Sequence, residues 1–360
     1  MDRRTFLTAA TASAALTTCR RGLASSSPTP IEALIKESGF CGTVLVTRDK
    51  EEMHSGFGPA ERNFATPCGR DTRYRIASIT KLFTATLIVQ LAAEGKLDLD
   101  GTIGVYLPQY SGPAKDKSTV RQLLHHTSGI ENFDKALTSF KGAESAGMAA
   151  YQMPHTSDDL VRLFASGPLV HAPGSTFDYN NADFVILGKM IEVLEGMPFG
   201  EVVQRRIAEP LKLQSTGLYP ERQIQPKLAS TYYRDGDGPI GNDLPVYPEN
   251  WYAAGGMTST TSDLLTFSRA LFGGQLVPAE WLQRMLTPGL EDYGFGLWIA
   301  TLDVKGKKHR FAQRPGRIMG ANTLLLQFLD DPLNILLLGN TNLADTDRLG
   351  FGIARQLLAT

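Results

Sequence analysis

The stretch RYRIASITKLFTATLIVQLAAEG, residues 73 to 95, places a Ser and a Lys three residues apart, Ser78 and Lys81, at the start of a long apolar run. Residues 78 to 94 have the pattern of an amphipathic helix, and Gly95 is typical of a helix end. Residues three apart share a helix face. The pair therefore fits either a nucleophile with its base, or a capping Ser beside a solvated Lys. One S-x-x-K motif is too common to decide between these readings.

The first residues of the chain have the composition of an export signal. MDRRTFLTAATASAALTTC begins with paired arginines, Arg3 and Arg4, and continues as an apolar stretch of small residues. This order is typical of a twin-arginine signal, so we expect residues 1–27 to be an export signal and linker, and the protein to reach the periplasm. Two processing routes stay open: cleavage near Ala24, which we favour, or lipid attachment at Cys19.

The composition is that of an ordinary globular protein. The 360 residues are 42% hydrophobic and 20% charged, with a net charge of -1, so nothing favours nucleic acid as a partner. Beyond the N-terminus no apolar run reaches the roughly 18 residues of a membrane span, so we expect none in the mature chain. We expect a small-molecule or peptide substrate as the partner. Cys41 and Cys68 form either a disulfide or two separate buried thiols, and their spacing does not decide which.

Strand patterns lie at both ends of the chain, and helical patterns lie between them. Two strands are predicted early, and four late, in CGTVLVTRD, EEMHSGFG, YGFGLWIATLD, KKHRFAQR, ANTLLLQFLDD and LNILLLGNTN. The simplest arrangement is an α+β fold: one antiparallel sheet built from both chain ends, flanked by helices, with a mainly helical lobe inserted. Within one domain, 28–360, we place the sheet lobe at about 31–77 and 257–360 and the helical lobe at about 82–256.

Two further short motifs contain residues that could do chemistry. In PGSTFDYNNADF, Tyr179 could carry a proton and Asn181 could bind an amide or carbonyl, but for this motif alone packing and helix capping are the better explanation. In RPGRIMGANTLLLQF, Arg314 offers a permanent charge and Gly316 lets a substrate approach a strand edge. Alone, that triplet is better explained as a surface turn.

The order of the three motifs, S-x-x-K, Y-x-N and basic-x-Gly, resembles the serine hydrolases that include class C β-lactamases, low-molecular-weight penicillin-binding DD-peptidases and related family VIII esterases. The stretches TRYRIASITKLFTA, LLHHTSGI, PGSTFDYNNADFVILGKMIE, AAGGMTSTTSDLLTF and YGFGLW are similar to parts of that family, in the same order. The resemblance covers nearly all of residues 31 to 358. It implies the β-lactamase/DD-peptidase-like fold, with the active site between the two lobes.

The resemblance also implies a role for each motif residue. Ser78 is the nucleophile that becomes acylated, and Lys81 shares in its activation. Tyr179 carries the proton between Ser78 and the leaving group, and Asn181 binds the acyl side of the substrate. The backbone N–H groups of Ser78 and Arg317 form the oxyanion hole. Whether Lys81 or Tyr179 is the base stays open, because closely coupled groups share their titration.

The third motif departs from the family, where Lys or His usually comes first and a small residue second. Here it is Arg314, Pro315 and Gly316. Arg314 keeps a charge that can stabilise a Tyr179 phenolate or bind a substrate carboxylate, but it exchanges no proton near neutral pH. Pro315 removes an N–H, though not the one assigned to the oxyanion hole. His309 is a worse candidate for the motif because no Gly lies two residues on. We expect an altered but active site.

The sequence thus predicts a serine hydrolase acting on an ester, amide or β-lactam bond through an acyl-enzyme. The alternative is a catalytically silent protein that binds a peptide or cell-wall fragment. No G-x-S-x-G, P-loop, G-x-G-x-x-G or H-E-x-x-H motif is present, and no cofactor or metal is expected. His125 and His126 belong to a stretch that is structural in the family. Tyr232, Tyr233 and Trp251, from the irregular region 217–256, either border the site or pack locally.

Overall fold

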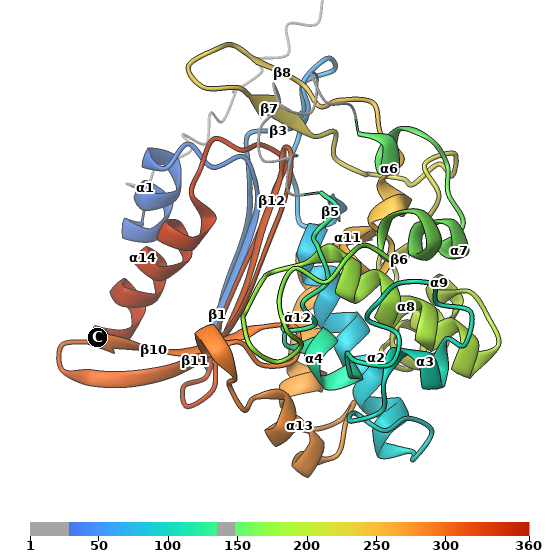
Figure 1. The fold of residues 1–360 in the computed structure, drawn as a ribbon. Coiled ribbons are helices and arrows are strands. Elements are labelled where there is room, and N and C mark those ends of the chain that lie inside the picture. The colour runs from blue at the N-terminus through green and yellow to red at the C-terminus, as the bar shows by residue number, and fades with distance from the viewer. Residues whose placement is uncertain (1–28, 135–147, 360) are drawn as a thin grey trace, which may run out of the picture.

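One six-stranded antiparallel sheet joins the two ends of the chain, in the order β10-β11-β12-β13-β1-β2 (Figure 1). The computed structural model describes residues 29–134 and 148–359. The predicted export signal, with Cys19 and Ala24, lies outside them. The sheet strands are β1 (Gly42–Arg48), β2 (Glu51–Phe57), β10 (Trp298–Val304), β11 (Lys307–Ile318), β12 (Ala321–Phe328) and β13 (Leu333–Gly339). The α+β fold with a sheet made from both chain ends is confirmed.

Helices cover both faces of this sheet. Two of them, α1 (Pro30–Glu37) and α14 (Thr346–Leu358), lie together against one face, and α12 and the helical segments of the middle of the chain lie on the other (Figure 1). In the part of the chain that the structure describes, the other helices are α2 (Thr80–Ala93), α3 (Ile103–Tyr106), α4 (Val120–Leu124), α6 (Ala149–Gln152), α7 (Ser157–Asp159), α8 (Asn181–Glu195), α9 (Phe199–Val203), α10 (Glu209–Leu211), α11 (Tyr252–Gly255), α12 (Thr261–Phe272) and α13 (Ala279–Met285). The 3₁₀ turns described there are η1 (Ala77–Ile79), η4 (Pro248–Trp251) and η5 (Leu290–Asp292), and π-helical turns, η2 (Leu160–Phe164) and η3 (Gln204–Ala208), follow α7 and α9.

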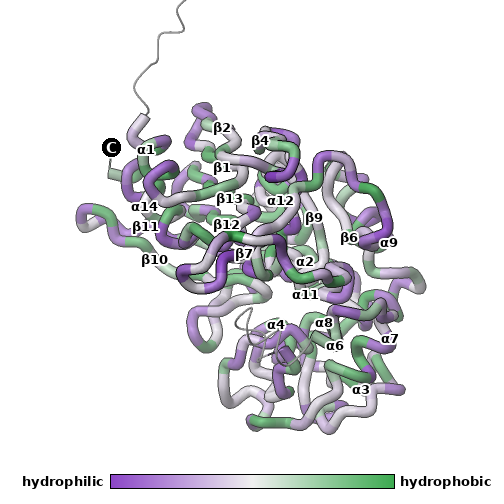
Figure 2. The backbone as a smooth tube through the Cα atoms, turned by 90° about the horizontal axis from the view of Figure 1, so that it is seen from above, coloured by the Kyte–Doolittle hydropathy of each residue, from purple (hydrophilic) through white to green (hydrophobic). Residues whose placement is uncertain are grey.

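The centre of the sheet is buried on both faces. β13 pairs with β12 on one side and β1 on the other, so that Leu337 lies between Leu324 and Val44. Every residue of β13 is buried, and nearly every residue of β12. In Figure 2 hydrophobic stretches of the tube lie by the labels of these two strands. A sheet covered on both faces explains why β12 and β13 contain continuous apolar runs rather than alternating patterns.

Helix α2 differs from the predicted amphipathic helix. Nearly all of its residues are buried, because it lies in the middle of the core and packs against both α8 and α11. Its polar residues are satisfied locally: Thr84 Oγ1 donates to the Ala253 carbonyl at 2.7 Å, and Thr86 Oγ1 donates to the Leu82 carbonyl at 2.8 Å. The prediction of a solvent face was therefore wrong, since threonine hydroxyls can bond to the backbone inside a helix.

Strand β11 is longer than predicted and runs through Pro315. The sequence pattern ends the strand at Arg314, but pairing with β12 continues to Ile318. Pairing with β10 stops at Gln313, so residues 314–318 have a strand on one side only. A residue without an N–H is tolerated at such an edge. The open edge faces η1, the turn that carries Ser78.

Shorter strands that the sequence pattern did not predict lie outside the six-stranded sheet. They are β3 (Pro59–Glu61), β4 (Thr66–Pro67), β5 (Tyr74–Arg75), β6 (Gly217–Leu218), β7 (Tyr232–Arg234), β8 (Ile240–Asn242) and β9 (Met257–Ser259). β9 pairs with both β5 and β6, which ties the chain just before Ser78 to the helical region. Across residues 29–134 and 148–359, no helix combines the length and the apolar character that a membrane crossing requires.

Candidate active site

Ser78 lies in the 3₁₀ turn η1, directly before helix α2. The preceding residue, Ala77, has φ 48°, a backbone conformation that non-glycine residues seldom adopt. The surrounding structure must hold this strain, as is common at functional sites. The Ile76 N–H donates to the Met257 carbonyl at 3.0 Å, which fixes the turn against β9. Ser78 thus lies at a helix start, where free N–H groups favour negative charge.

Lys81 is fully buried, and its ammonium group has three acceptors. Nζ donates to Ser78 Oγ at 3.3 Å, to Asn181 Oδ1 at 2.6 Å and to the Ala254 carbonyl at 2.8 Å. Burial lowers the pKa of Lys81, and the charge of Arg314 acts in the same direction, while Tyr179 opposes both. A buried amine with a lowered pKa can exchange protons with a neighbouring hydroxyl.

Tyr179 brings the second motif to the nucleophile. Its Oη donates to Ser78 Oγ at 2.9 Å, and it lies directly before Asn180, the N-cap of α8. Burial alone would raise the pKa of Tyr179. The charges of Arg314 and Lys81, together with the hydrogen bonds from Lys81 and Ser78, outweigh the effect of burial and lower the pKa to about 8. The phenol therefore titrates closer to neutrality than an ordinary tyrosine.

Arg314 of the third motif is fully buried and bonded to the protein on all sides of its guanidinium. Nε donates to the Ser78 carbonyl at 2.7 Å, Nη1 donates to Tyr293 Oη at 2.9 Å, and Nη2 donates to Tyr179 Oη. Of the two roles expected for this charge, the geometry favours stabilising a Tyr179 phenolate. A substrate carboxylate would have to displace these internal partners.

Gly316 and Arg317 lie on the open edge of β11. The Arg317 side chain is exposed and donates to Asp347 at 2.6 Å, so only its backbone remains for the oxyanion role expected of it. A Cβ on Gly316 would lie 2.6 Å from the Ile76 carbonyl oxygen and 3.0 Å from the Ser78 nitrogen. Glycine is thus required where the third motif passes the nucleophile.

Replacing Gly316 with alanine is expected to push the Ser78 turn away from β11. We expect a loss of roughly 1–3 kcal/mol in stability from overpacking, and at least ~10-fold in kcat/KM because a small misplacement of reacting groups slows catalysis strongly. Thermal melting and ester hydrolysis measure the two effects. Gly241→Ala is the matched control, because a Cβ there meets nothing within 4 Å. Equal behaviour of the two variants would contradict the close approach.

The structure brings the predicted residues together and adds others that the motifs did not mark. Asp134 accepts from Asn181 Nδ2 at 2.6 Å and from Tyr151 Oη at 2.7 Å, and so orients the Asn181 amide towards Lys81. No sequence pattern pointed to Asp134. Tyr293 was present only within the stretch YGFGLW that resembles the family.

His126 packs behind the site, in keeping with a structural role. Its ring lies 4.4 Å from the Tyr179 ring, and its Nδ1 lies 3.0 Å from Asp183 Oδ2. Burial lowers the pKa of His126 and raises the pKa of Asp183, and both shifts favour the neutral forms. In the described residues no cluster of three or more His, Cys, Asp or Glu is placed to hold a metal ion.

Other residues that the sequence singled out pack locally. Tyr232 is buried, with its Oη donating to Glu61 at 2.9 Å, and Trp251 stacks on Tyr151 at 3.8 Å between ring centroids. These two aromatic residues therefore pack locally. Cys41 and Cys68 are both buried and free in the structure.

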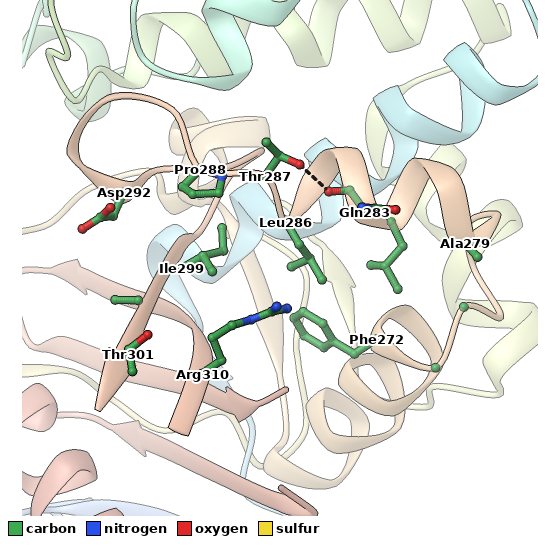
Figure 3. Close-up of a pocket in the computed structure, with 14 residues that line it drawn as sticks. Phe272, Ala279, Gln283, Leu286, Thr287, Pro288, Asp292, Ile299, Thr301 and Arg310 are labelled. Carbon is green, nitrogen blue, oxygen red and sulfur yellow. Dashed lines mark hydrogen bonds between the residues drawn. The ribbon is translucent and has the colours of Figure 1, made fainter. Parts of the chain in front are cut away.

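A separate cavity of about 1000 Å³ lies among α12, α13, β10 and β11. Figure 3 shows Arg310 directed towards Phe272, with Leu286 and Ile299 beside them. None of Ser78, Lys81, Tyr179, Asn181, Arg314, Gly316 or Arg317 lines it. This cavity is thus distinct from the constellation around Ser78.

Comparison with known proteins agrees with the fold described above. Residues 31–356 match the family model described as Beta-lactamase. The putative penicillin-binding protein PbpX of Bacillus subtilis is 28% identical over 272 residues, covering 75% of this chain and 65% of that protein.

Two solved structures have the same fold. A penicillin-binding protein from Bacillus halodurans has a TM-score of 0.78 and 25% identity over 92% of this chain and 100% of its own. A D-stereospecific amidohydrolase from Streptomyces has a TM-score of 0.73 and 31% identity over 89% and 95%. The match to the family model, which spans most of the residues, decides the assignment: this chain belongs to the Beta-lactamase family.

Proposed function

We propose that this protein is a serine hydrolase that cleaves an ester, amide or β-lactam bond through an acyl-enzyme on Ser78. The observation that carries the proposal is the pair of donors on one oxygen: Tyr179 Oη at 2.9 Å and Lys81 Nζ at 3.3 Å both reach Ser78 Oγ. A capping serine beside a solvated lysine would show neither contact. Membership of the Beta-lactamase family supports the same chemistry.

The reaction follows from these contacts. As Ser78 Oγ bonds to the substrate carbonyl carbon, its proton passes to the Tyr179–Lys81 pair. The carbonyl oxygen becomes an oxyanion, which the backbone N–H groups of Ser78 and Arg317 are assigned to bind. The oxyanion then collapses, the bond between the carbonyl carbon and the leaving atom breaks, and the pair gives its proton to the leaving atom. Water next adds to the carbonyl carbon of the acyl-enzyme and gives a proton to the pair. The bond to Ser78 Oγ breaks, and Ser78 regains its proton.

The charges around Ser78 suit this sequence. Lys81 and Arg314 are both fully buried, and both lower the pKa of Tyr179. Their fields act in a site with little water, where electrostatic stabilisation is stronger than in bulk solvent. The two buried cations thus stabilise the phenolate form of Tyr179, which is the form that can accept the Ser78 proton.

Covalent labelling tests the proposal directly. The wild type is expected to react with a fluorophosphonate at Ser78 and to hydrolyse a para-nitrophenyl ester, whereas Ser78→Ala should do neither. Digestion and mass spectrometry locate the label. Ser175→Ala, an exposed serine in the segment before Tyr179, is the control and should be labelled normally. An unlabelled wild type without esterase activity would refute the proposal.

We also propose that the protein is exported to the periplasm through a twin-arginine signal. The paired Arg3 and Arg4 and the apolar stretch after them support this. Replacing both arginines with lysine keeps the charge and should leave the protein in the cytoplasm. Cell fractionation measures this, and unchanged export of that variant would contradict a twin-arginine route.

A further inference from the structure

We infer that the leaving group of the substrate is uncharged and apolar, such as an alcohol or phenol, and that leaving groups bearing a carboxylate are disfavoured. This deepens the proposed acyl-enzyme function and rests on it, because it concerns the part that departs from Ser78. Two features of the site support it: its cations are already bonded within the protein, and the surroundings of Tyr179 are aromatic.

The place of the leaving group follows from proton transfer. The leaving atom must lie beside Tyr179 Oη to receive a proton, within ordinary hydrogen-bond reach. The oxyanion lies further along β11, near the N–H groups of Ser78 and Arg317. The leaving group therefore extends towards Arg314 and towards Trp298, which lies on the neighbouring strand β10 and is paired with Gln313.

The cations near this position have their hydrogen bonds committed. Arg314 uses all three nitrogens on the Ser78 carbonyl, Tyr293 and Tyr179, and no part of it is exposed. Lys81 is equally buried and has three acceptors of its own. The Arg317 side chain donates to Asp347. Because Arg314 and Lys81 have no exposed surface, a substrate carboxylate cannot contact either cation directly, and at Arg317 it would have to compete with Asp347.

Aromatic rings lie beside Tyr179 and Arg314 on this side of the site. Trp298 stacks near Tyr179, with 6.0 Å between ring centroids, and meets Tyr293 edge to face at 4.6 Å. The Arg314 guanidinium lies 5.3 Å from the Trp298 ring centroid, so its charge is covered by aromatic faces. Trp298 is only partly buried and can contact a substrate. A carboxylate there would lose water without gaining a partner, and would face the negative ring surfaces.

Two matched esters test the inference. The methyl ester of meta-acetoxybenzoic acid and meta-acetoxybenzoate itself release phenols that differ only in the carboxylate. After division by each compound's rate with hydroxide, wild-type kcat/KM should favour the neutral ester by at least ~10-fold. Equal or better turnover of the anion would overturn the inference. Failure to hydrolyse either ester, together with no fluorophosphonate label on Ser78, would instead refute the proposed hydrolase function.

A variant pair then tests where the discrimination arises. Trp298→Arg puts a cation beside the leaving group and should narrow the preference for the neutral ester at least ~3-fold, since a charge-assisted hydrogen bond becomes available. Thr301→Arg adds the same charge at an exposed position of the same strand and should leave the preference within about 2-fold. If Trp298→Arg does not narrow the preference for the neutral ester, the leaving group does not lie beside Trp298. The same conclusion follows if both variants narrow the preference equally.

Discussion

Replacing Lys81 with methionine is expected to lower kcat/KM by at least ~10³-fold while the protein stays folded. Methionine fills the buried channel of the lysine stem but supplies no ammonium group to Ser78 and Asn181. It also removes one of the two cations that lower the pKa of Tyr179. Removing a buried charge recovers its desolvation cost, which offsets part of the loss from the unpaired Asn181 and Ala254 acceptors. Ester hydrolysis and thermal melting measure the two quantities separately.

Thr84 provides a matched control on the same helix. Its Oγ1 donates to the Ala253 carbonyl at 2.7 Å, just as Lys81 Nζ donates to the Ala254 carbonyl at 2.8 Å. Thr84→Val thus removes a comparable bond between α2 and α11 without touching Ser78. We expect it to lose about 1 kcal/mol of stability and to keep kcat/KM within about threefold of wild type. A loss as large as that of Lys81→Met would mean that the bond to α11, rather than the ammonium, matters.

The sequence was sufficient to predict the sheet and the residues that meet around Ser78. Strand patterns at both ends of the chain lead to one sheet because β1 and β13 pair directly, with Val44 opposite Leu337. Tyr179, Asn181 and Arg314 lie far from Ser78 in the chain, and no local pattern could bring them together. Their proximity was implied by the resemblance to a family, and the geometry bears it out.

The sequence could not predict which hydrogen bonds the site residues form with one another. The sequence pattern places Arg314 at a strand end and leaves two roles open for it, stabilising a Tyr179 phenolate or binding a substrate carboxylate. Its contacts to Tyr293 and the Ser78 carbonyl depend on β11 continuing through Pro315, which the pattern does not predict. Asp134 was not identified, since a lone carboxylate in a loop has no periodic pattern to mark it. Such contacts between distant segments arise from tertiary packing, which local patterns do not encode.

The charge of Arg314 is expected to set the pH dependence of the reaction. Burial raises the pKa of Tyr179, and Arg314 is the strongest of the groups that bring it down to about 8. A nearby cation stabilises the phenolate, so removing the cation must raise the pKa. If the phenolate is the form that accepts the Ser78 proton, the ascending limb of kcat/KM should lie near pH 8 in wild type. It should move at least one unit higher in Arg314→Met.

Arg314→Lys separates the charge from the hydrogen bonds. Lysine keeps the positive charge but cannot bond to the Ser78 carbonyl, Tyr293 and Tyr179 in the same planar fork. Both variants should lose stability, because each leaves buried acceptors unpaired. Only Arg314→Met should move the ascending limb of the pH profile strongly. The measurement is kcat/KM as a function of pH, made on folded protein. Equal shifts in the two variants would show that the hydrogen bonds of the guanidinium, and not its charge, control the pKa of Tyr179. An unshifted limb in both variants would show that neither Tyr179 nor Lys81 sets it, because Arg314 lowers the pKa of Lys81 as well.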